Sequence, residues 1–322
     1  MSARAELLAD RGAAAVGTEF FRSRPFLDAE GVTHTLRIES DAGVLVAPLL
    51  VRPIGGGPEL DAISPYGYPG LVPADRVRHS ARMANLRANA LFDPADVDFS
   101  ATGLVSAFIR HTLAEPPLAE TTERNVVQIA DPALPPKSRP SDRRQVRRNL
   151  EAGYELQLVP GAETTAAQRA GFLGLYEQTM RRTGAAPHYF FAAAYFDRVL
   201  EADRTWLALA SGPSGELAAA SLATVSDGYL HYYLSGSADS HLRDSPMKNV
   251  VAALVEHSAA LGLPLNLGGG ISRGDALEEF KRGFANREQP WHTSEIVCDL
   301  EAYERLSAGR DPGGFFPAYR AP

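Results

Sequence analysis

Lys281 is a charged residue within an otherwise apolar helical stripe. Leu277, Phe280, Lys281 and Phe284 follow one another at i, i+3, i+4 and i+7, the spacing that places side chains on one face of a helix. A lysine at such a position either extends its ammonium to water along apolar carbon or is held inside a site for its charge. An ammonium held in a site can stabilise negative charge that develops during a reaction.

The elements before this helix would position the lysine. The sequence predicts a buried strand over 265–267, then the loop Gly268-Gly269-Gly270, and then a helix capped by Asp275 with Glu278 at its third position. A glycine loop before a helix can cradle phosphate. A phosphate-binding P-loop, however, needs lysine after its last glycine, where this chain has Asp275. We therefore interpret the glycines as a tight turn.

A predicted strand over 229–235 carries a second set of polar groups. In an extended strand Tyr229, His231 and Tyr233 share one face. That face is compatible with the lining of a cleft, and equally with an ordinary half-exposed strand. The other histidines are scattered, with no His-Glu-x-x-His motif, so no metal site is expected. The single cysteine, Cys298, excludes an intrachain disulfide.

A basic segment follows a proline-rich stretch at 131–136. Between Lys137 and Arg148 there are six basic residues and one acidic residue, a local charge of +5 in a chain of net charge -7. A helix is predicted over 141–152, and its arginines at 143, 144, 147 and 148 share one broad face. Such a cluster suits phosphate oxygens, and the alternative is a solvated helix face.

Length and composition set the broad class. The chain has 322 residues, of which 45% are hydrophobic and 22% are charged, typical of a globular protein. No apolar run approaches the length of a membrane helix, so a cytoplasmic protein without a transmembrane segment is expected.

The prolines at 131–136 mark a boundary between two modules, 1–135 and 136–322, and each mixes strands with helices. In the first module, turn residues at 41–43 predict a hairpin of strands over 33–39 and 44–51, and a helix is predicted over about 74–91. In the second module, an inner face at helical spacing predicts a helix over about 165–182, and Ser245 as N-cap followed by Pro246 predicts the start of another.

The whole pattern resembles the FemABX-type branch of the GNAT superfamily, including its FemAB-like relatives. The motifs that carry the resemblance cover most of the chain. They are Ser64-Pro65-Tyr66-Gly67-Tyr68-Pro69-Gly70, Leu175-Tyr176-Glu177-Gln178-Thr179-Met180-Arg181-Arg182, His188-Tyr189-Phe190, Tyr233-Leu234-Ser235-Gly236-Ser237, Leu267-Gly268-Gly269-Gly270 and Glu279-Phe280-Lys281-Arg282-Gly283-Phe284.

The resemblance implies an α/β fold of two GNAT-like modules, with mixed, mostly antiparallel sheets flanked by helices and a cleft between the modules. The second module would carry the reaction centre, and the last ~25 residues would pack back on the first. Matching the motifs places Phe280 and Lys281 at the reaction centre. It assigns substrate contacts to Arg182, Tyr189 and Tyr233, and to Tyr66 and Tyr68. No N-terminal lysine matches the family's acceptor-phosphate lysine, and no helical arm is predicted, which speaks against a nucleotide-linked cell-wall acceptor.

The activity implied is transfer of an aminoacyl group from aminoacyl-tRNA to an amine, with formation of a peptide or other amide bond. The acceptor would be a small molecule, a natural-product intermediate or a cell-wall precursor. Lys281 would stabilise the oxyanion or the leaving oxygen, and His231 and Asp275 are alternative bases. A monomer needing no metal or cofactor, and binding no DNA, is expected. The residues expected to hold tRNA phosphates are Lys137, Arg143, Arg144, Arg147, Arg148 and Lys248.

Two other functions are considered. GNAT enzymes that use acyl-CoA bind its pyrophosphate with a [RQ]-x-x-G-x-[GA] loop before a helix, and the corresponding segment is Arg243-Asp244-Ser245-Pro246-Met247-Lys248. Pro246 replaces the first glycine and removes a backbone N–H, which disfavours acyl-CoA. A non-catalytic binding module is disfavoured by the charge on the apolar stripe.

Overall fold

The computed structural model describes residues 3–15, 19–41, 43–74, 92–114 and 116–321. Apart from its first residue, the helix predicted over about 74–91 lies outside the described residues. The chain divides into two compact units, the first comprising Met1–Arg124 with Trp291–Pro322 and the second comprising Asn125–Pro290. The expected modules, 1–135 and 136–322, stay a prediction.

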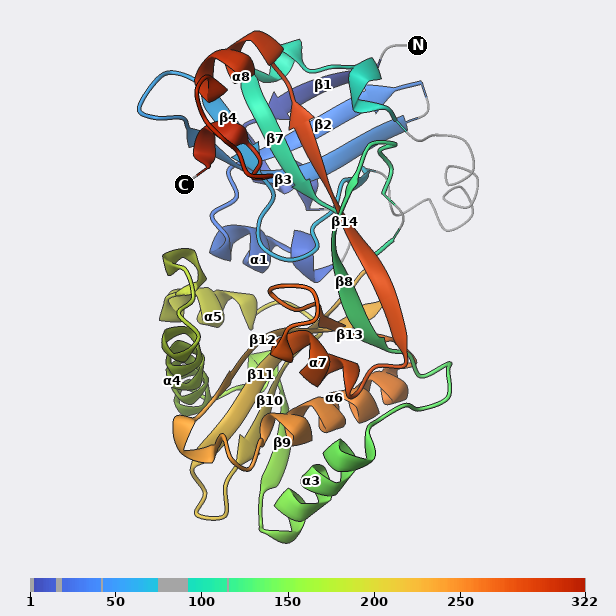
Figure 1. Cartoon of the computed structure of the whole chain (residues 1–322), viewed down its shortest axis with the longest axis vertical. Helices are drawn as coiled ribbons and strands as arrows, with labels where there is room; N and C mark the ends of the chain where they lie inside the picture. The colour runs from blue at the N-terminus through green and yellow to red at the C-terminus, as the bar shows by residue number, and fades with distance from the viewer. Residues whose placement is uncertain (1–2, 16–18, 42, 75–91, 115, 322) are drawn as a thin grey trace. The chain divides into compact units, whose positions relative to one another are not determined.

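The first unit is built on a mixed, mostly antiparallel sheet (Figure 1). Its strand order is β6-β1-β2-β3-β4-β7-β14, with β5 paired to β3. The predicted hairpin near 41–43 is confirmed, because β2 and β3 pair antiparallel down to Ser40 and Gly43. The bounds are β1 Ala3–Leu8, β2 His34–Ser40, β3 Gly43–Pro53, β4 Leu60–Ile63, β5 Val72–Pro73, β6 Val97–Asp98, β7 Leu104–Arg110, β14 Arg287–Val297, α1 Arg24–Ala29 and α8 Leu300–Ser307.

The C-terminal segment is bound into the first unit by polar contacts. The carboxylate of Asp61, fully buried, pairs with Arg52 at 2.9 Å and with Arg320. The hydroxyls of Ser106 and Tyr319 are 2.7 Å apart in the same interior. A buried carboxylate requires such compensation, since an unpaired charge there would be strongly destabilising.

The second unit has the strand order β8-β13-β12-β11-β10-β9, antiparallel except for the parallel pair β12 and β13. The first unit has a comparable parallel pair, β4 and β7, after its antiparallel strands. The expected mixed, mostly antiparallel sheets are therefore confirmed in both units. The bounds are β8 Thr122–Ala130, β9 Glu155–Pro160, β10 Thr205–Ser211, β11 Leu217–Ser226, β12 Tyr229–Ser237, β13 Leu265–Gly268, α3 Pro140–Glu151, α4 Ala166–Arg182, α5 Ala193–Val199, α6 Met247–Leu261 and α7 Ala276–Arg282.

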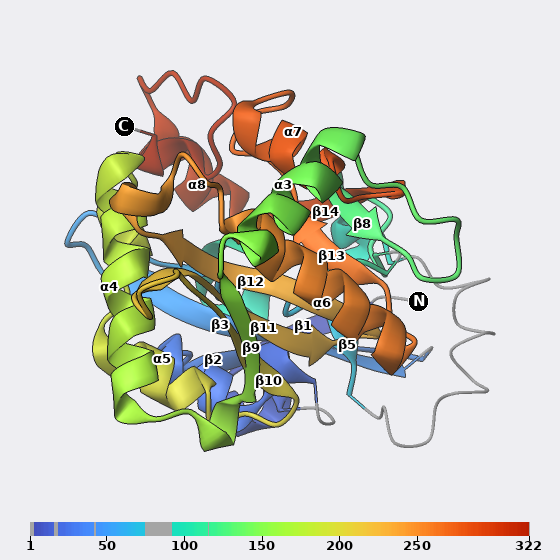
Figure 2. The same ribbon diagram turned by 90° about the horizontal axis from the view of Figure 1, so that it is seen from below.

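Helix α6 supplies much of the core of the second unit. Its residues Val250, Val251 and Leu254 are fully buried with alanines of β10 and β11. Helices α3 and α6 lie side by side (Figures 1 and 2), joined by the buried side chains of Asn149 and Asn249, whose amide groups are 2.7 Å apart.

Two local predictions need correction. Ser245 was expected to cap α6, but the helix begins at Met247 with Pro246 at the N-cap, and Ser245 adopts a left-handed φ of 50°. Strict alternation was expected along β12, but a bulge pairs Leu234 with Leu222 and Tyr232 with Ala223. Tyr233 is therefore an extra residue, and a bulge re-aims the side chains beyond it.

Candidate active site

Lys281 is buried on α7, with 8% of its surface exposed. Its Nζ donates a hydrogen bond of 2.6 Å to the carbonyl oxygen of Gly269. Burial lowers the pKa of this ammonium to about 8, and the negative charge of Asp275 opposes that effect. Of the predicted stripe, Phe280 and Phe284 lie 5.8 Å apart by ring centroids, whereas Leu277 is exposed. The stripe is thus only partly buried, but its lysine is inside.

The glycine loop before α7 is held by side chains from outside it. The Gly268 N–H donates to the side-chain oxygen of Asn266 at 2.8 Å, and Gly268 has a left-handed φ of 75°. The carbonyl of Gly270 accepts from the side-chain amide of Asn125 at 2.9 Å. A Cβ on Gly269 would lie 2.6 Å from the Asn125 amide group, so any larger residue there would displace the Asn125 side chain.

Asp275 organises this loop and the start of α7. Its carboxylate accepts backbone N–H groups from Ile271 at 2.6 Å, Ser272 at 2.9 Å and Glu278 at 2.8 Å. The predicted N-cap is confirmed. These hydrogen bonds stabilise the anion and lower the pKa of Asp275, so the carboxylate is a weak proton acceptor at neutral pH. The contacts weigh against its expected role as a base.

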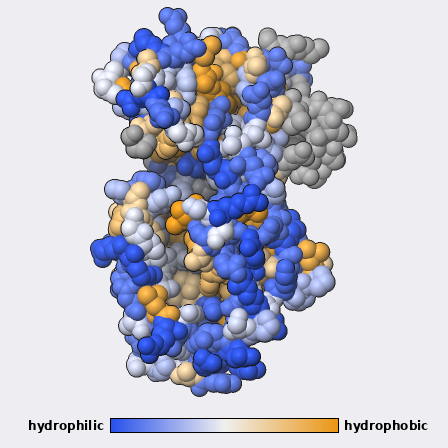
Figure 3. All heavy atoms as spheres, in the orientation of Figure 1, coloured by the Kyte–Doolittle hydropathy of each residue, from blue (hydrophilic) through white to orange (hydrophobic). Residues whose placement is uncertain are grey.

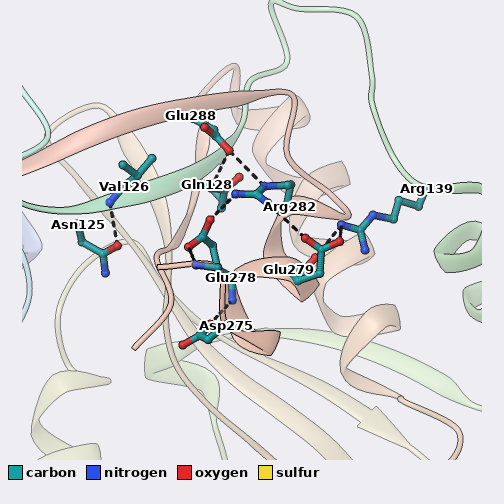
Figure 4. Close-up of polar contacts among 10 residues, drawn as sticks. Asn125, Val126, Gln128, Arg139, Asp275, Glu278, Glu279, Arg282 and Glu288 are labelled. Atoms are coloured by element: carbon teal, nitrogen blue, oxygen red, sulfur yellow. Dashed lines mark hydrogen bonds and ion pairs between the residues drawn. The ribbon is translucent and has the colours of Figure 1, made fainter. Parts of the chain in front are cut away.

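An ion network covers the side of α7 that carries its glutamates (Figure 4). Arg282 pairs with Glu278 and lies 3.2 Å from the Glu288 carboxylate. Glu278 is buried and also accepts the Gly274 N–H at 2.7 Å. Arg139 pairs with Glu279 and donates to its backbone carbonyl at 3.0 Å. These contacts fix the orientation of α7, and therefore of Lys281.

His231 lies in the interior of the second unit rather than on an open face. Its Nε2 is 3.1 Å from the carbonyl oxygen of Ser226, and its Nδ1 is 3.1 Å from the side-chain amide of Asn266. Burial lowers the pKa of His231 to about 4, which leaves the ring neutral at neutral pH. Both nitrogens are engaged, so these contacts weigh against a role as general base.

The other predicted residues of the second unit make mostly structural contacts. The hydroxyl of Tyr233 is 2.9 Å from that of Tyr195 in α5. The carbonyl of Tyr189 accepts the Tyr176 hydroxyl at 2.8 Å. Arg182 pairs with Asp239 and donates to the Ser237 carbonyl at 3.2 Å, at the end of β12.

Tyr66 and Tyr68 belong to the first unit. The fully buried Arg22 donates to the carbonyl of Pro69 at 2.6 Å, and the Tyr66 N–H donates to Glu30 at 2.9 Å. The Tyr68 ring makes edge contacts with Phe21 at 5.6 Å and with Trp291 at 5.4 Å. Their loop is therefore rigidly held, in a different unit from Lys281.

The basic residues differ in how far their charges are compensated. Lys248 pairs at 2.9 Å with the buried Asp142, Arg147 is 3.7 Å from Glu151, and Arg143 donates to Ser138. Within the described residues, Lys137, Arg144 and Arg148 are exposed and make no hydrogen bond or ion pair. In Figure 3 the region where Figure 1 places α3 is mostly hydrophilic. Of the six predicted basic residues, those at 137, 144 and 148 are therefore the ones with uncompensated side-chain charge within the described part of the chain.

The backbone groups of the segment before α6 already form hydrogen bonds with other groups of the chain. The carbonyl of Asp244 accepts the side-chain amides of Gln145 at 3.1 Å and Asn149 at 2.8 Å, both from α3. The first helical amides are also used, since Lys248 N–H donates to Ser245 at 3.0 Å and Asn249 N–H to Pro246 at 2.9 Å.

Among the described residues, no group of three or more histidine, cysteine, aspartate or glutamate side chains is arranged to hold a metal ion. None of the described helices is long and apolar enough to cross a membrane.

Sequence reasoning missed Asn266 and Asn125. Asn266 interrupts the apolar strand Leu265-Asn266-Leu267, and a polar residue inside such a strand must find partners there. That signal could have identified Asn266. Asn125 lies far away in sequence, and nothing local indicates its contact with Gly270.

Comparisons with known proteins agree with this fold. Residues 136–282 match the family model described as an acetyltransferase (GNAT) domain. The solved structure of FemX is similar over 92% of this chain and 96% of its own, with a TM-score of 0.60 and 11% identity. No curated protein sequence gives a significant match.

Two further solved structures are similar. One is the C-terminal domain of a putative lysylphosphatidylglycerol synthetase from Agrobacterium fabrum, with 13% identity, a TM-score of 0.55 and coverage of 89% of this chain and 90% of that one. The other is L-PGS from Bacillus licheniformis, with 12% identity, a TM-score of 0.56 and coverage of 88% and 91%. The chain has a FemX-like GNAT fold, which confirms the fold expected from the motifs. The GNAT domain supports an acyltransferase.

Proposed function

We propose that the protein is an N-acyltransferase that moves an aminoacyl group from aminoacyl-tRNA to an amine. The observation that carries the proposal is the buried Lys281 ammonium, fixed by the carbonyl of Gly269 in the middle of the glycine loop. A charge removed from water interacts strongly with a reacting group beside it, which is the condition for electrostatic catalysis.

The reaction needs no covalent intermediate. The amine nitrogen attacks the ester carbonyl, an oxyanion forms, and the bond to the ribose oxygen breaks as the amide forms. The amine loses one proton and the ribose oxygen gains one, so the reaction is proton-neutral. Lys281, with a pKa of about 8, is suited to stabilise the oxyanion and to give a proton to the leaving oxygen.

The exposed cations of α3 and of the segment before it support a donor that carries phosphates. Lys137, Arg144 and Arg148 have no acidic partner among the described residues, so their charges are available to tRNA phosphates. Lys248 is less suited than expected, because Asp142 already compensates it at 2.9 Å.

Acyl-CoA is the second candidate donor, because the GNAT domain match describes an acetyltransferase. The contacts before α6 argue against it. A pyrophosphate at the helix N-terminus would need free backbone donors, and the amides of Lys248 and Asn249 already donate to the chain.

The acceptor is proposed to be an amine. Two of the similar structures are named for lysylphosphatidylglycerol synthesis, so a lipid acceptor is a necessary arm of the test. Charged total tRNA with labelled amino acids would be incubated with amine acceptors or with phosphatidylglycerol vesicles, and the products identified by mass spectrometry.

Replacing Lys281 tests the proposal directly. Lys281→Ala should lower the transfer rate by about 100-fold or more, because one charge-stabilising donor is worth roughly that factor. The exposed Arg198→Ala, which removes a cation that pairs with Glu201 outside the proposed site, is the control and should retain more than about half the rate. Circular dichroism would verify folding of both variants. Full activity of a folded Lys281→Ala protein would refute the assignment.

A further inference from the structure

Three consecutive glycines before α7 each depend on a side chain from outside the loop. Asn266 accepts the Gly268 N–H at 2.8 Å, Lys281 donates to the Gly269 carbonyl at 2.6 Å, and Asn125 donates to the Gly270 carbonyl at 2.9 Å. Glycines lack side chains and have wide conformational freedom, so the loop has few means of fixing itself. The position of the Gly269 carbonyl is therefore set by its neighbours.

His231 determines how Asn266 is oriented. The Ser226 carbonyl can only accept, so the Nε2 of His231, 3.1 Å away, carries the proton. The Nδ1 then has a lone pair and accepts from the Asn266 amide nitrogen at 3.1 Å. This places the Asn266 oxygen toward the Gly268 N–H, as the 2.8 Å contact requires.

The chain of contacts from His231 through Asn266 to the glycine loop, which we call the relay, is shielded from water. His231 and Asn266 are 2% and 1% exposed. An alternative hydrogen bond to solvent is therefore not available to either side chain, and a buried network whose members are all satisfied holds one arrangement strongly. Removing the Asn266 amide would remove the acceptor of the Gly268 N–H and the donor that faces the His231 Nδ1.

We propose that Asn266, oriented by His231, is a positioning residue that fixes the Gly269 carbonyl and through it the Lys281 ammonium. The placement of Lys281 by this relay stands on the contacts alone. The consequence for catalysis rests on the proposed function.

The chain offers a direct way to observe Lys281. It contains three lysines, Lys137, Lys248 and Lys281. Protein labelled with ¹³Cε-lysine therefore gives three titratable NMR signals, and Lys281→Arg assigns the one of interest. The exposed Lys137 serves as the internal reference.

Asn266→Ala should loosen the loop and admit water to the ammonium. The NMR titration midpoint of Lys281 should then rise toward that of Lys137 by about one pH unit or more. The control is Asn249→Ala, another buried asparagine of the second unit, which bonds to Val146 and Asn149 away from the loop. Its Lys281 midpoint should match wild type. A folded Asn266→Ala protein with an unchanged Lys281 midpoint would overturn the proposal.

A measurement on the wild-type protein keeps the test valid if Asn266→Ala does not fold. The Gly268 amide should exchange with solvent about 100-fold more slowly than an unprotected amide, because it is bound to Asn266. Unprotected exchange at Gly268 would contradict the relay.

Activity separates this proposal from the proposed function. If both hold, Asn266→Ala should lower kcat by about tenfold or more and leave KM for charged tRNA within about twofold. A shifted Lys281 midpoint in a protein whose wild type transfers no aminoacyl group would retain the relay and reject the function.

Discussion

At the scale of the residue, the ammonium of Lys281 is buried away from water and carries a proton that it can lose. Lysine is rare in this chain: of its 32 lysines and arginines, three are lysines. A guanidinium stays charged in proteins, whereas a buried ammonium is readily shifted into the range of neutral pH. Helical spacing left open whether this lysine extends to water or is held inside, and the fold shows that it is buried. Its partner, the Gly269 carbonyl, was not predicted, because a glycine loop leaves no side-chain pattern to read.

The pH dependence of transfer follows from this ammonium. If the charged form acts, the rate divided by the neutral fraction of the acceptor amine should stay level below about pH 8 and fall as pH rises through the pKa of about 8. Lys281→Arg keeps its charge and should lose that decline, at a lower overall rate. Single-turnover rates from pH 6 to 10 would be measured with an amine of known pKa, and a corrected rate that increases through pH 8 would contradict the ammonium role.

The lowered pKa of Lys281 also affects the stability of the folded protein. Its effect on stability with rising pH has the opposite sign to its effect on the transfer rate. Unfolded Lys281 keeps its ordinary pKa near 10.5, so between about 8 and 10.5 the unfolded chain binds more protons. The contribution of Lys281 to the free energy of unfolding therefore increases as pH rises through this window. Below pH 8 the folded state bears a cost of about 3 kcal/mol for the buried charge. Lys281 thus destabilises the folded state when it is charged.

His231 and Asp275 show where residue-level reasoning reaches its limit. Both side chains are chemically competent bases, and the sequence alone does not distinguish a base from a cap or a relay. The difference lies in partners: three backbone N–H groups for Asp275, and Ser226 and Asn266 for His231. Only the folded chain brings these partners together.

At the scale of the element, the contact of α4 with β12 leaves no space for a side chain. A Cβ on Gly236 would lie 2.5 Å from the carbonyl oxygen of Leu175, a backbone atom that cannot move away easily. Gly236→Ala should lower the free energy of unfolding by about 2 kcal/mol or more. Gly174, exposed in α4 with open space around its Cβ position, is the matched control.

Gly174→Ala should raise the free energy of unfolding by about 0.5–1 kcal/mol, because alanine favours the helix. Urea titrations followed by circular dichroism would compare the two variants. Equal effects would show that packing between α4 and β12 is looser than the structure indicates.

Helix α3 was predicted as a basic helix, and its exposed arginines are confirmed. The double variant Arg144→Gln with Arg148→Gln should weaken tRNA binding by about tenfold. The slope of log affinity against log salt concentration should also decrease by the amount that about two phosphate contacts contribute. The control is Arg181→Gln with Arg198→Gln, two exposed arginines already paired with Glu177 and Glu201. Filter binding at several salt concentrations would be compared.

Because both double variants lose two charges, a non-specific charge effect would weaken both equally. That result would remove α3 from the donor site. Weakening confined to the α3 variant would support it.

At the scale of the whole molecule, the sequence predicted the class of fold better than its connections. Strand-like segments and turn residues predicted the β2–β3 hairpin, an inner face at helical spacing predicted α4, and the Asp275 cap predicted α7. The pairing of Asp61 with Arg320 joins residues far apart in the chain, as does the insertion of β14 beside β7. Such long-range pairings have no local signature, so they could not be predicted.

The bulge in β12 had a comparable effect on the candidate site. An extra residue at Tyr233 breaks the period of two on which the predicted polar face depended. The motifs therefore predict a region for the site, while the contacts of individual side chains within it required the fold.

Our central proposal is that the buried ammonium of Lys281 promotes transfer of an aminoacyl group from tRNA to an amine acceptor. The most direct test is a single-turnover competition in which enzyme, an amine acceptor, differently labelled aminoacyl-tRNA and acetyl-CoA are mixed. The account predicts that the amide product carries the tRNA-derived label and that Lys281→Ala lowers its formation by about 100-fold or more. Product labelled from acetyl-CoA, or undiminished transfer by Lys281→Ala, would contradict it.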